Sequence, residues 1–172
     1  DFDCPGVRDY KVMHGTNNMT KGPAMTRAQA IQAMEAGIDM LEKLVKDGYD
    51  LFATGEMGIG NTSTSSAIAS VLLGVSPEIV TGRGAGLSTP GLERKIKAIT
   101  KAIEVNQPDA EDIVDVISKV GGLDIAGLCG CFLGAAAHKV PILIDGFISS
   151  IAALCAVRMV PAVQDYLFAS HV

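Results

Sequence analysis

Two short apolar runs, each followed directly by glycine and then by a helical pattern, constrain the fold of this chain most strongly. The first run is DLFATG, residues 50–55, and the second is VPILIDG, residues 140–146. Short runs that are apolar throughout are typical of parallel strands buried on both faces. Strands that alternate with helices pair in parallel through right-handed crossovers. The pattern therefore predicts an α/β protein with a Rossmann-like parallel sheet and helices on both faces.

Helical patterns fill most of the remaining chain. Thr26 is the expected N-cap of a helix over 26–48, whose apolar positions recur at intervals of three and four until Gly48. Residues 1–25 show no such period, because PG, HGTNNM and KGPAM interrupt it. We further expect helices over 62–74, from Pro90 onward, over 109–120 with Asp109 as N-cap, over 121–139 and over 147–160, and a third strand within 165–172.

The 172 residues, of which 48% are hydrophobic, have the size and composition of one domain with a substantial core. We divide them into an irregular lead-in segment, residues 1–25, and a Rossmann-like core, residues 26–172. The chain begins at Asp1 without a methionine and stops at Val172 inside an apolar stretch. We therefore expect the core to be truncated at its C-terminal end.

Composition argues against several classes of function. The net charge of −5 leaves no basic stripe to neutralise phosphates, so we expect no nucleic-acid partner. No apolar run of about 20 residues predicts a membrane span, and no signal peptide is visible, which favours a cytoplasmic protein. The cysteines lack the spacing of a zinc site, so we expect buried, reduced thiols and no metal. They are Cys4, Cys129, Cys131 and Cys155.

The loop GEMGIGN, residues 55–61, combines glycines with one carboxylate, Glu56. It lacks the third glycine of the dinucleotide fingerprint and the closing GK[ST] of a Walker loop. The glycines still let backbone N–H groups approach an anion at the start of the next helix. A tight strand-to-helix turn is the alternative. Because Glu56 would repel a phosphate, we expect it to face a ribose hydroxyl pair or a cationic pyridinium ring.

A second glycine loop, GRGAG at residues 82–86, precedes a helix that carries Lys95. The ammonium of Lys95 would complement a phosphate as a point charge. The alternative is a solvated helix face, because Arg94, Lys97 and Lys101 are close in sequence.

Ligands of parallel sheets bind beyond the carboxyl ends of the strands. Glu56 follows the first predicted strand, Asp145 follows the second, and Ser170 and His171 follow the third. We therefore expect them to share one crevice. A carboxylate such as Asp145 at the end of an apolar strand is costly unless it is paired or binds something, although it could also cap the next helix.

Several stretches together resemble the nicotinate-nucleotide–dimethylbenzimidazole phosphoribosyltransferases over essentially the whole chain. They are GPAMTRAQA, GEMGIGNTSTSSAI, GRGAGLSTPGLERKI, GLDIAGLCGCFLGAAAHKVPILIDGFISSIAAL and YLFASH. The resemblance implies the large-domain core of the family fold. It also implies transfer of phosphoribose from nicotinate mononucleotide to 5,6-dimethylbenzimidazole, giving nicotinate and α-ribazole 5′-phosphate in cobalamin biosynthesis. Such enzymes are homodimers without a metal or redox cofactor.

The resemblance also suggests site residues. Glu56 and Asp145 match catalytic-site carboxylates, and Glu56 also contacts the nucleotide. The substrate-binding set is Glu56, Gly58, Gly84, Ala85, Gly86 and Lys95, with the phosphate against the second glycine loop and Lys95.

One departure concerns the general base. The family's glutamate lies in an LGEGSGA-like motif beyond the SH strand, where this chain has already ended. We therefore expect residues 1–172 alone to be inactive in transfer. The alternative function is a Rossmann-like nucleotide-binding or regulatory module without catalysis.

Overall fold

The computed structural model describes residues 5–171 and places three short strands in one parallel sheet. The strands pair in the order β1-β2-β3, with Phe52 opposite Ile142 and Ile142 opposite Leu167. Their bounds are β1 (Phe52–Ala53), β2 (Ile142–Ile144) and β3 (Leu167–Ala169). The predicted parallel α/β architecture is therefore confirmed.

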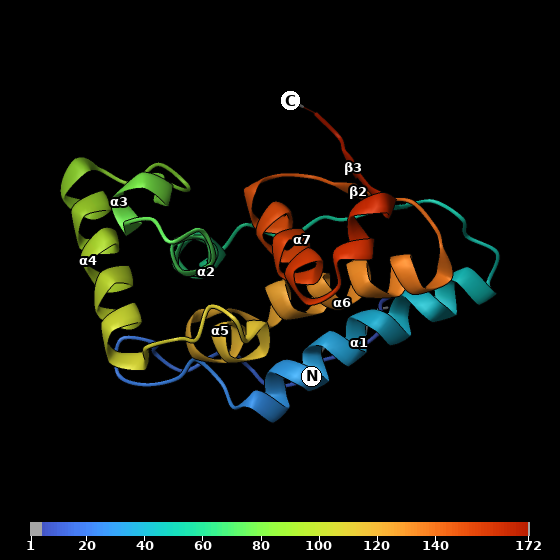
Figure 1. The fold of residues 1–172 in the computed structure, drawn as a ribbon, viewed down its shortest axis with the longest axis horizontal. Helices are drawn as coiled ribbons and strands as arrows, with labels where there is room; N and C mark the ends of the chain where they lie inside the picture. The colour runs from blue at the N-terminus through green and yellow to red at the C-terminus, as the bar shows by residue number, and fades with distance from the viewer. Residues whose placement is uncertain (1–4, 172) are drawn as a thin grey trace.

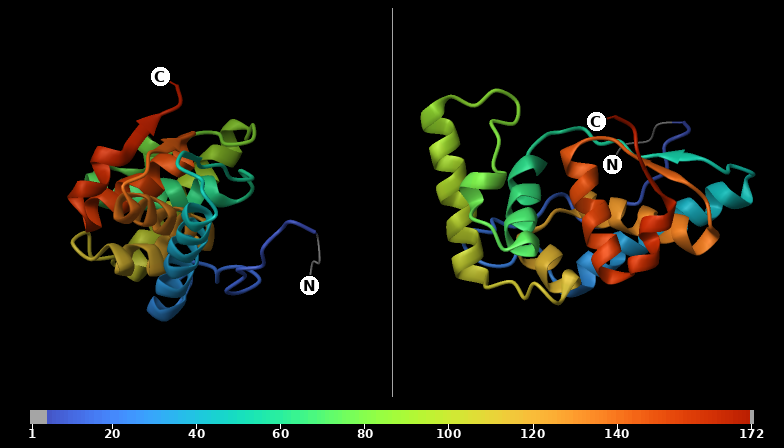
Figure 2. Two further views of the ribbon diagram at one scale, coloured as in Figure 1. Left: turned by 90° about the vertical axis from the view of Figure 1, so that its right-hand side faces the viewer. Right: turned by 45° about the horizontal axis from the view of Figure 1, so that its top comes forward.

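Helices make up most of the described chain. They are α1 (Arg27–Lys46), α2 (Asn61–Leu73), α3 (Pro77–Val80), α4 (Thr89–Asn106), α5 (Ile113–Val120), α6 (Leu123–His138), α7 (Phe147–Met159) and the short 3₁₀ helix η1 (Pro161–Tyr166). In Figure 1, α6 and α7 lie below the sheet, and α1 runs beneath α6. Helices α2, α3 and α4 lie to the left of the sheet, at the other end of the molecule. The turned views of Figure 2 show the same grouping.

The two faces of the sheet differ in their surroundings. Ile142 is 1% exposed, and Phe52 and Leu167 of the same face pack against the hydrophobic core. On the other face, Ala53 is exposed and Phe168 is 51% exposed. Side chains alternate between the faces of a sheet, so an apolar strand does not by itself say which face is covered. Within residues 5–171, the predicted cover of helices is present on one face only.

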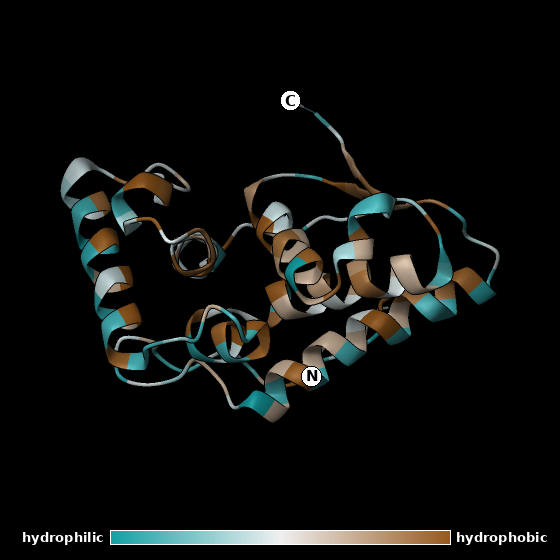
Figure 3. Ribbon diagram, in the orientation of Figure 1, coloured by the Kyte–Doolittle hydropathy of each residue, from teal (hydrophilic) through white to brown (hydrophobic). Residues whose placement is uncertain are grey.

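The core is built around the close contact of α1 with α6. A Cβ on Gly37 would collide with the carbonyl of Gly127, and one on Gly130 would collide with the carbonyl of Met34. Glycine therefore lets the two backbones approach within contact distance. Figure 3 shows α1 with hydrophilic positions among its apolar ones, whereas α6 and α7 are mostly pale or hydrophobic. This pair of helices also forms the floor of the largest cavity described below.

Local signals placed most helix ends correctly. Thr26 caps α1 in a reciprocal capping box with Gln29, in which each residue's side chain accepts a bond from the other's backbone N–H, at 3.2 and 2.9 Å. The prediction of Asp109 as a cap was wrong. α5 begins after Asp112, whose side chain accepts from the N–H of Asp115 at 3.1 Å, while Asp109 forms the preceding turn.

Residues 5–25 contain no helix or strand, as predicted. Two short helices, α3 and η1, were not predicted. Cys129 and Cys155 are buried free thiols, and Cys131 is a half-buried one, in agreement with the prediction; Cys4 lies outside the described residues, as does Val172. None of the described helices is long and apolar enough to cross a membrane.

Candidate active site

The carboxyl edge of the sheet carries two of the predicted site residues. β1 and β2 are parallel neighbours, so the segments that follow them leave the sheet on the same side. Glu56 lies three residues after β1, and Asp145 directly follows β2. The topology thus places both carboxylates at the edge where parallel sheets bind ligands.

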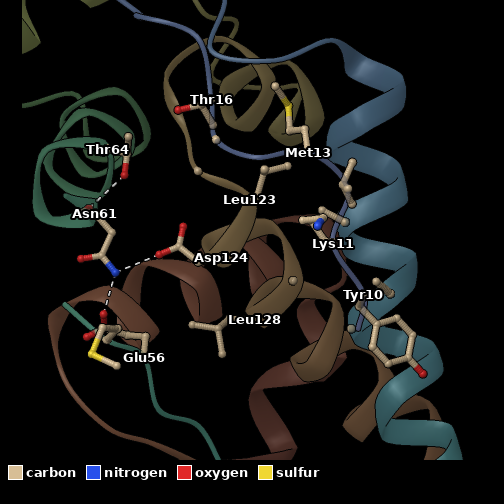
Figure 4. Close-up of a pocket in the computed structure, with 18 of the residues that line it drawn as sticks. Tyr10, Lys11, Met13, Thr16, Glu56, Asn61, Thr64, Leu123, Asp124 and Leu128 are labelled. Carbon is tan, nitrogen blue, oxygen red and sulfur yellow. Dashed lines mark hydrogen bonds between the residues drawn. The ribbon is translucent and has the colours of Figure 1, made fainter. Parts of the chain in front are cut away.

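Glu56 is held by donors from its own loop and from the helix that follows (Figure 4). Its Oε2 atom accepts a hydrogen bond from the backbone N–H of Gly58. It accepts a second one from Nδ2 of Asn61 at 2.6 Å, which Figure 4 shows as a dashed line. The same Asn61 nitrogen donates to Oδ2 of Asp124 at 2.8 Å. Asn61 is therefore a bridge between two carboxylates that come from different parts of the chain.

Glu56 and Asp124 line the large cavity, which has a volume of about 810 Å³. Its other walls come from the lead-in segment around Met13, from α1 at Met40 and from α6 at Leu128. Figure 4 shows this arrangement, with the lead-in segment and α1 facing the glycine loop across the cavity. The pocket is therefore mainly apolar, with paired carboxylates at the end next to Asn61.

Cys131 also lines the large cavity. Burial raises the pKa of its thiol to about 11. The side chain is therefore a neutral, weakly polar part of the wall at physiological pH.

A small cavity of about 270 Å³ lies on the other side of the glycine loop. The lining includes most of the predicted substrate-binding set: Gly58, Gly84, Ala85, Gly86 and Lys95. The Lys95 ammonium donates to Oγ1 of Thr62 at 2.9 Å and to the carbonyl of Gly82 at 3.1 Å. Burial lowers the pKa of Lys95, because desolvation disfavours its charged form. The cavity thus contains a fixed, partly desolvated cation.

Lys95 differs from the other cations of its helix. It is half-buried, whereas Arg94, Lys97 and Lys101 are exposed. The loop opposite is constrained as well, because Arg83 folds back and donates to the carbonyl of Leu87 at 2.8 Å. The alternative of a solvated helix face therefore applies to the neighbours of Lys95 and not to Lys95 itself.

Both the backbone conformation and the space beside Lys95 require glycine at position 84. Its φ of +56° lies in the left-handed region. A Cβ at this position would lie 3.1 Å from Oγ1 of Thr62 and 3.7 Å from Nζ of Lys95. A side chain here would therefore fill the space beside the ammonium.

The predicted site residues do not all line one crevice. Gly60 borders both the large and the small cavity, so Glu56 lies close to the lysine pocket without lining it. Asp145 is exposed and lines neither cavity. It does not cap α7 either, since the N-cap is Gly146 without a side-chain bond. Ser170 and His171 bond to each other at 2.8 Å and are exposed.

Three residues of the site were missed from the sequence: Asn61, Thr62 and Asp124. Asn61 and Thr62 begin α2 directly after the glycine loop, where the helix start favours polar contacts to a ligand. Asp124 is the second residue of α6, an otherwise very apolar helix that begins after Gly121 and Gly122. Its carboxylate is exposed and lies in the first turn of α6, where the helix dipole favours an acid, so no local pattern marked it as a site residue.

The two cavities differ in the chemistry of their linings. Partly desolvated ammonium and glycine backbone in the small cavity suit an anion such as phosphate. Paired carboxylates in the large cavity suit hydroxyl groups or a cation. Within residues 5–171, no group of three or more His, Cys, Asp or Glu side chains is arranged to hold a metal ion.

The sequence matches known proteins over its whole length. A family model described as phosphoribosyltransferase matches residues 1–172. The nicotinate-nucleotide–dimethylbenzimidazole phosphoribosyltransferase of Acetivibrio thermocellus is 59% identical over 171 residues, which are 99% of this chain and 49% of that protein. The protein of the same name from Clostridium tetani is 56% identical over 96% of this chain and 46% of its own length.

A solved structure has the same fold. The crystal structure of CobT from Thermus thermophilus superposes with a TM-score of 0.91 at 37% identity, covering 98% of this chain and 50% of that one. The chain thus spans about half the length of the relatives it matches.

Proposed function

Because the chain belongs to the phosphoribosyltransferase family, we propose that it forms the nucleotide-binding part of an enzyme that moves phosphoribose from nicotinate mononucleotide to 5,6-dimethylbenzimidazole. The products are nicotinate and α-ribazole 5′-phosphate, an intermediate in cobalamin biosynthesis. The sequence-based resemblance and the names of the relatives in Acetivibrio thermocellus and Clostridium tetani support this substrate pair.

The observation that carries the proposal is the opposite charge on the two sides of Gly60. Nicotinate mononucleotide has a phosphate at one end and a positively charged pyridinium ribose at the other. The phosphate suits the small cavity, with Lys95 and the backbone of Gly84, Ala85 and Gly86. The pyridinium ribose suits the large cavity, with Glu56 at its edge.

The proposed chemistry is a displacement at C1′ of the ribose. An azole nitrogen of dimethylbenzimidazole forms the new bond to C1′, while the bond from C1′ to the pyridinium nitrogen breaks. The second azole nitrogen gives up its proton to a general base, the role that the resemblance assigns to the glutamate of the LGEGSGA-like motif outside residues 1–172. The departing ring takes the electron pair of that bond and leaves as neutral pyridine nitrogen. Glu56 stabilises the positive charge that develops on the ribose in the transition state. We place Asp145 in the same role, supported by its position at the same sheet edge.

The direct test is turnover by the protein as its gene encodes it. Incubation with nicotinate mononucleotide and dimethylbenzimidazole should yield equal amounts of nicotinate and α-ribazole 5′-phosphate, detected by chromatography and mass spectrometry. Replacing the mononucleotide by ribose 5-phosphate removes the leaving group and should abolish the product. Failure to form α-ribazole 5′-phosphate under these conditions contradicts the proposal.

The second candidate, a nucleotide-binding module without catalysis, predicts a different result. It would bind nicotinate mononucleotide in calorimetry and form no product with any azole acceptor. Titration and turnover measured on one preparation therefore separate the two functions.

We also propose that the protein is a cytoplasmic homodimer. Large apolar side chains at the surface support association: Met57, Ile59 and Ile79 are 83%, 82% and 74% exposed. Sedimentation at tens of micromolar should show a dimer, and a purely monomeric species would count against it.

The proposal also includes a division of the chain into two segments. We regard the parallel sheet with its flanking helices as a Rossmann-like nucleotide-binding core, residues 26–172, preceded by the lead-in segment 1–25. In support of one cooperative unit, Ala24 and Met25 at the end of the lead-in are 1% and 2% exposed, and their N–H groups bond to α5. The two segments should unfold in one transition, as followed by hydrogen exchange.

A further inference from the structure

Resting on that proposed function, we propose that Asn61 is a positioning residue, whose amide holds the Glu56 carboxylate in the orientation that stabilises the ribose during transfer. Glu56 is carried by a loop that is rich in glycine. Both Gly58 and Gly60 have positive φ values, +75° and +80°. Glycine restricts the backbone less than any other residue, so the orientation of the Glu56 side chain depends on the groups that bond to it.

The amide of Asn61 uses both of its hydrogens on carboxylates. Nδ2 donates to Glu56 at 2.6 Å and to Asp124 at 2.8 Å, and a primary amide has no third N–H. Rotating the amide by half a turn would place its oxygen against two anions. The two acceptors therefore fix the orientation of Asn61, and Asn61 in turn fixes Glu56.

The buried environment of Asn61 indicates that its donors determine its placement. The residue is 7% exposed, and its Oδ1 atom is buried without a hydrogen-bond partner among the residues that the structure describes. An unpaired buried acceptor is unfavourable. The two bonds from Nδ2 to charged acceptors offset the cost of leaving Oδ1 unpaired. This is expected of an amide whose role is to hold the two carboxylates.

The bridge is anchored by the starts of two helices. Asn61 is the first residue of α2, and its carbonyl accepts from Oγ1 of Thr64 at 2.9 Å. Asp124 lies in the first turn of α6, after Gly122. A Cβ on Gly122 would lie 2.5 Å from Oδ1 of Asp124, so glycine leaves the space that this carboxylate occupies. Glu56, which stands on a loop, is thus tied to two helices.

This arrangement predicts a loss in kcat that is larger than the change in KM. The phosphate contacts lie in the small cavity, which Asn61 does not line. Misplacing a group that acts on the reacting carbon by about 1 Å can cost on the order of 100-fold in rate. We expect Asn61→Asp, which keeps the shape and replaces the donors by an anion, to lower kcat by roughly 10- to 100-fold. KM for nicotinate mononucleotide should rise by no more than about fivefold, the loss expected when the charge of Glu56 is removed altogether.

Asn106 offers a closely matched control. It is 8% exposed, and its Nδ2 donates at 2.7 Å to the carbonyls of both Met19 and Ala102, away from both cavities. Asn106→Asp therefore also replaces two buried donors by an anion. We expect it to reduce stability towards urea without changing kcat of the folded protein.

Exchanging the side chains at positions 61 and 124 separates a role in positioning Glu56 from a role in stability alone. In the double variant Asn61→Asp/Asp124→Asn, the amide at position 124 can again donate to position 61, whereas Glu56 faces a carboxylate. Stability should recover relative to Asn61→Asp, and kcat should not. Recovery of kcat in the exchange variant, or a kcat for Asn61→Asp within twofold of wild type, overturns the proposal.

A readout without turnover keeps the inference separate from the proposed reaction. The N–H of Gly58 donates to Glu56, so its amide exchange reports where that carboxylate lies. Exchange at Gly58 should accelerate in Asn61→Asp and in the exchange variant, and remain as in wild type in Asn106→Asp. Unchanged exchange at Gly58 in Asn61→Asp overturns the positioning role even if the protein catalyses no transfer, whereas absent transfer by wild type contradicts only the proposed function.

Discussion

The two cavities on either side of Gly60 obtain their charge by different means. In the small cavity, a single ammonium is fixed by Thr62 and by the carbonyl of Gly82, and backbone conformation shapes the rest. In the large cavity, Glu56 stands on a glycine loop and is held by Asn61, which also bonds to Asp124. The comparison indicates that backbone and one fixed cation form the small cavity, whereas in the large cavity the carboxylate depends on another side chain for its placement. Changes to one cavity should therefore leave the function of the other intact.

The largest effect is expected from Lys95→Ala. Removal of a charge-assisted bond to phosphate should weaken binding of nicotinate mononucleotide by roughly 1.5–3 kcal/mol, measured by calorimetry. Binding of nicotinate riboside, which lacks the phosphate, should be unchanged. Lys101→Ala removes an exposed cation from the same helix and serves as the control. Equal losses for mononucleotide and riboside would show that Lys95 does not bind the phosphate.

A smaller effect on the same cavity is expected from Gly84→Ala. A left-handed conformation costs a non-glycine residue about 1–2 kcal/mol, so stability towards urea should fall by that amount. The new Cβ also crowds Lys95, and affinity for the mononucleotide should fall several-fold. Gly74→Ala is the matched control, because its φ is +63° and its Cβ would meet nothing within 4 Å. Identical affinities in the two variants would remove Gly84 from the phosphate site.

Glu56→Gln tests the large cavity. The substitution keeps the size of the side chain and removes its charge, while the cavity remains open to solvent. We expect a loss of about 1 kcal/mol in binding of nicotinate mononucleotide, the range of solvent-exposed ion pairs. Affinity for ribose 5-phosphate, which has no cationic ring, should not change. A comparable loss for both ligands would contradict the separation of the two cavities.

The smallest effect is a pH dependence of binding. Burial lowers the pKa of Lys95 in the free protein, and a bound phosphate would raise it again. Affinity for the mononucleotide should therefore be greatest while Lys95 is charged, and should decline as pH rises through the pKa of Lys95 in the free protein. Calorimetry at a series of alkaline pH values should show a decline in wild type that is absent in Lys95→Ala. A flat profile in wild type would argue against a charge-assisted contact.

Much of the fold follows from local patterns in the sequence. The capping box at Thr26, the glycine that ends α2 and the proline in the first turn of α4 are signals within a few residues. The three strands were predicted from short apolar runs, and their parallel pairing followed from the helices between them. The second glycine loop and Lys95 were an anion-site candidate in the sequence, with a solvated helix face as the alternative, and the structure places both at one small cavity.

Other features depend on residues far apart in the sequence. Asp112 rather than Asp109 caps α5, and its carboxylate is paired at 2.6 Å with Arg27, 85 residues away. Asp145 lies at the predicted edge and outside both cavities, because a strand end defines the edge and not the direction of a side chain.

By itself, the sequence determined the longer helices, the parallel strands and the two glycine loops, because each depends on backbone preferences over a few neighbouring positions. Only the tertiary structure decided that Lys95 bonds to Thr62, that the sheet has one open face within the described residues, and that Asn61 joins Glu56 to Asp124. Asn61 and Asp124 are 63 positions apart. Their contact exists because α2 and α6 pack into one core, and packing between distant segments leaves no local signal in the chain.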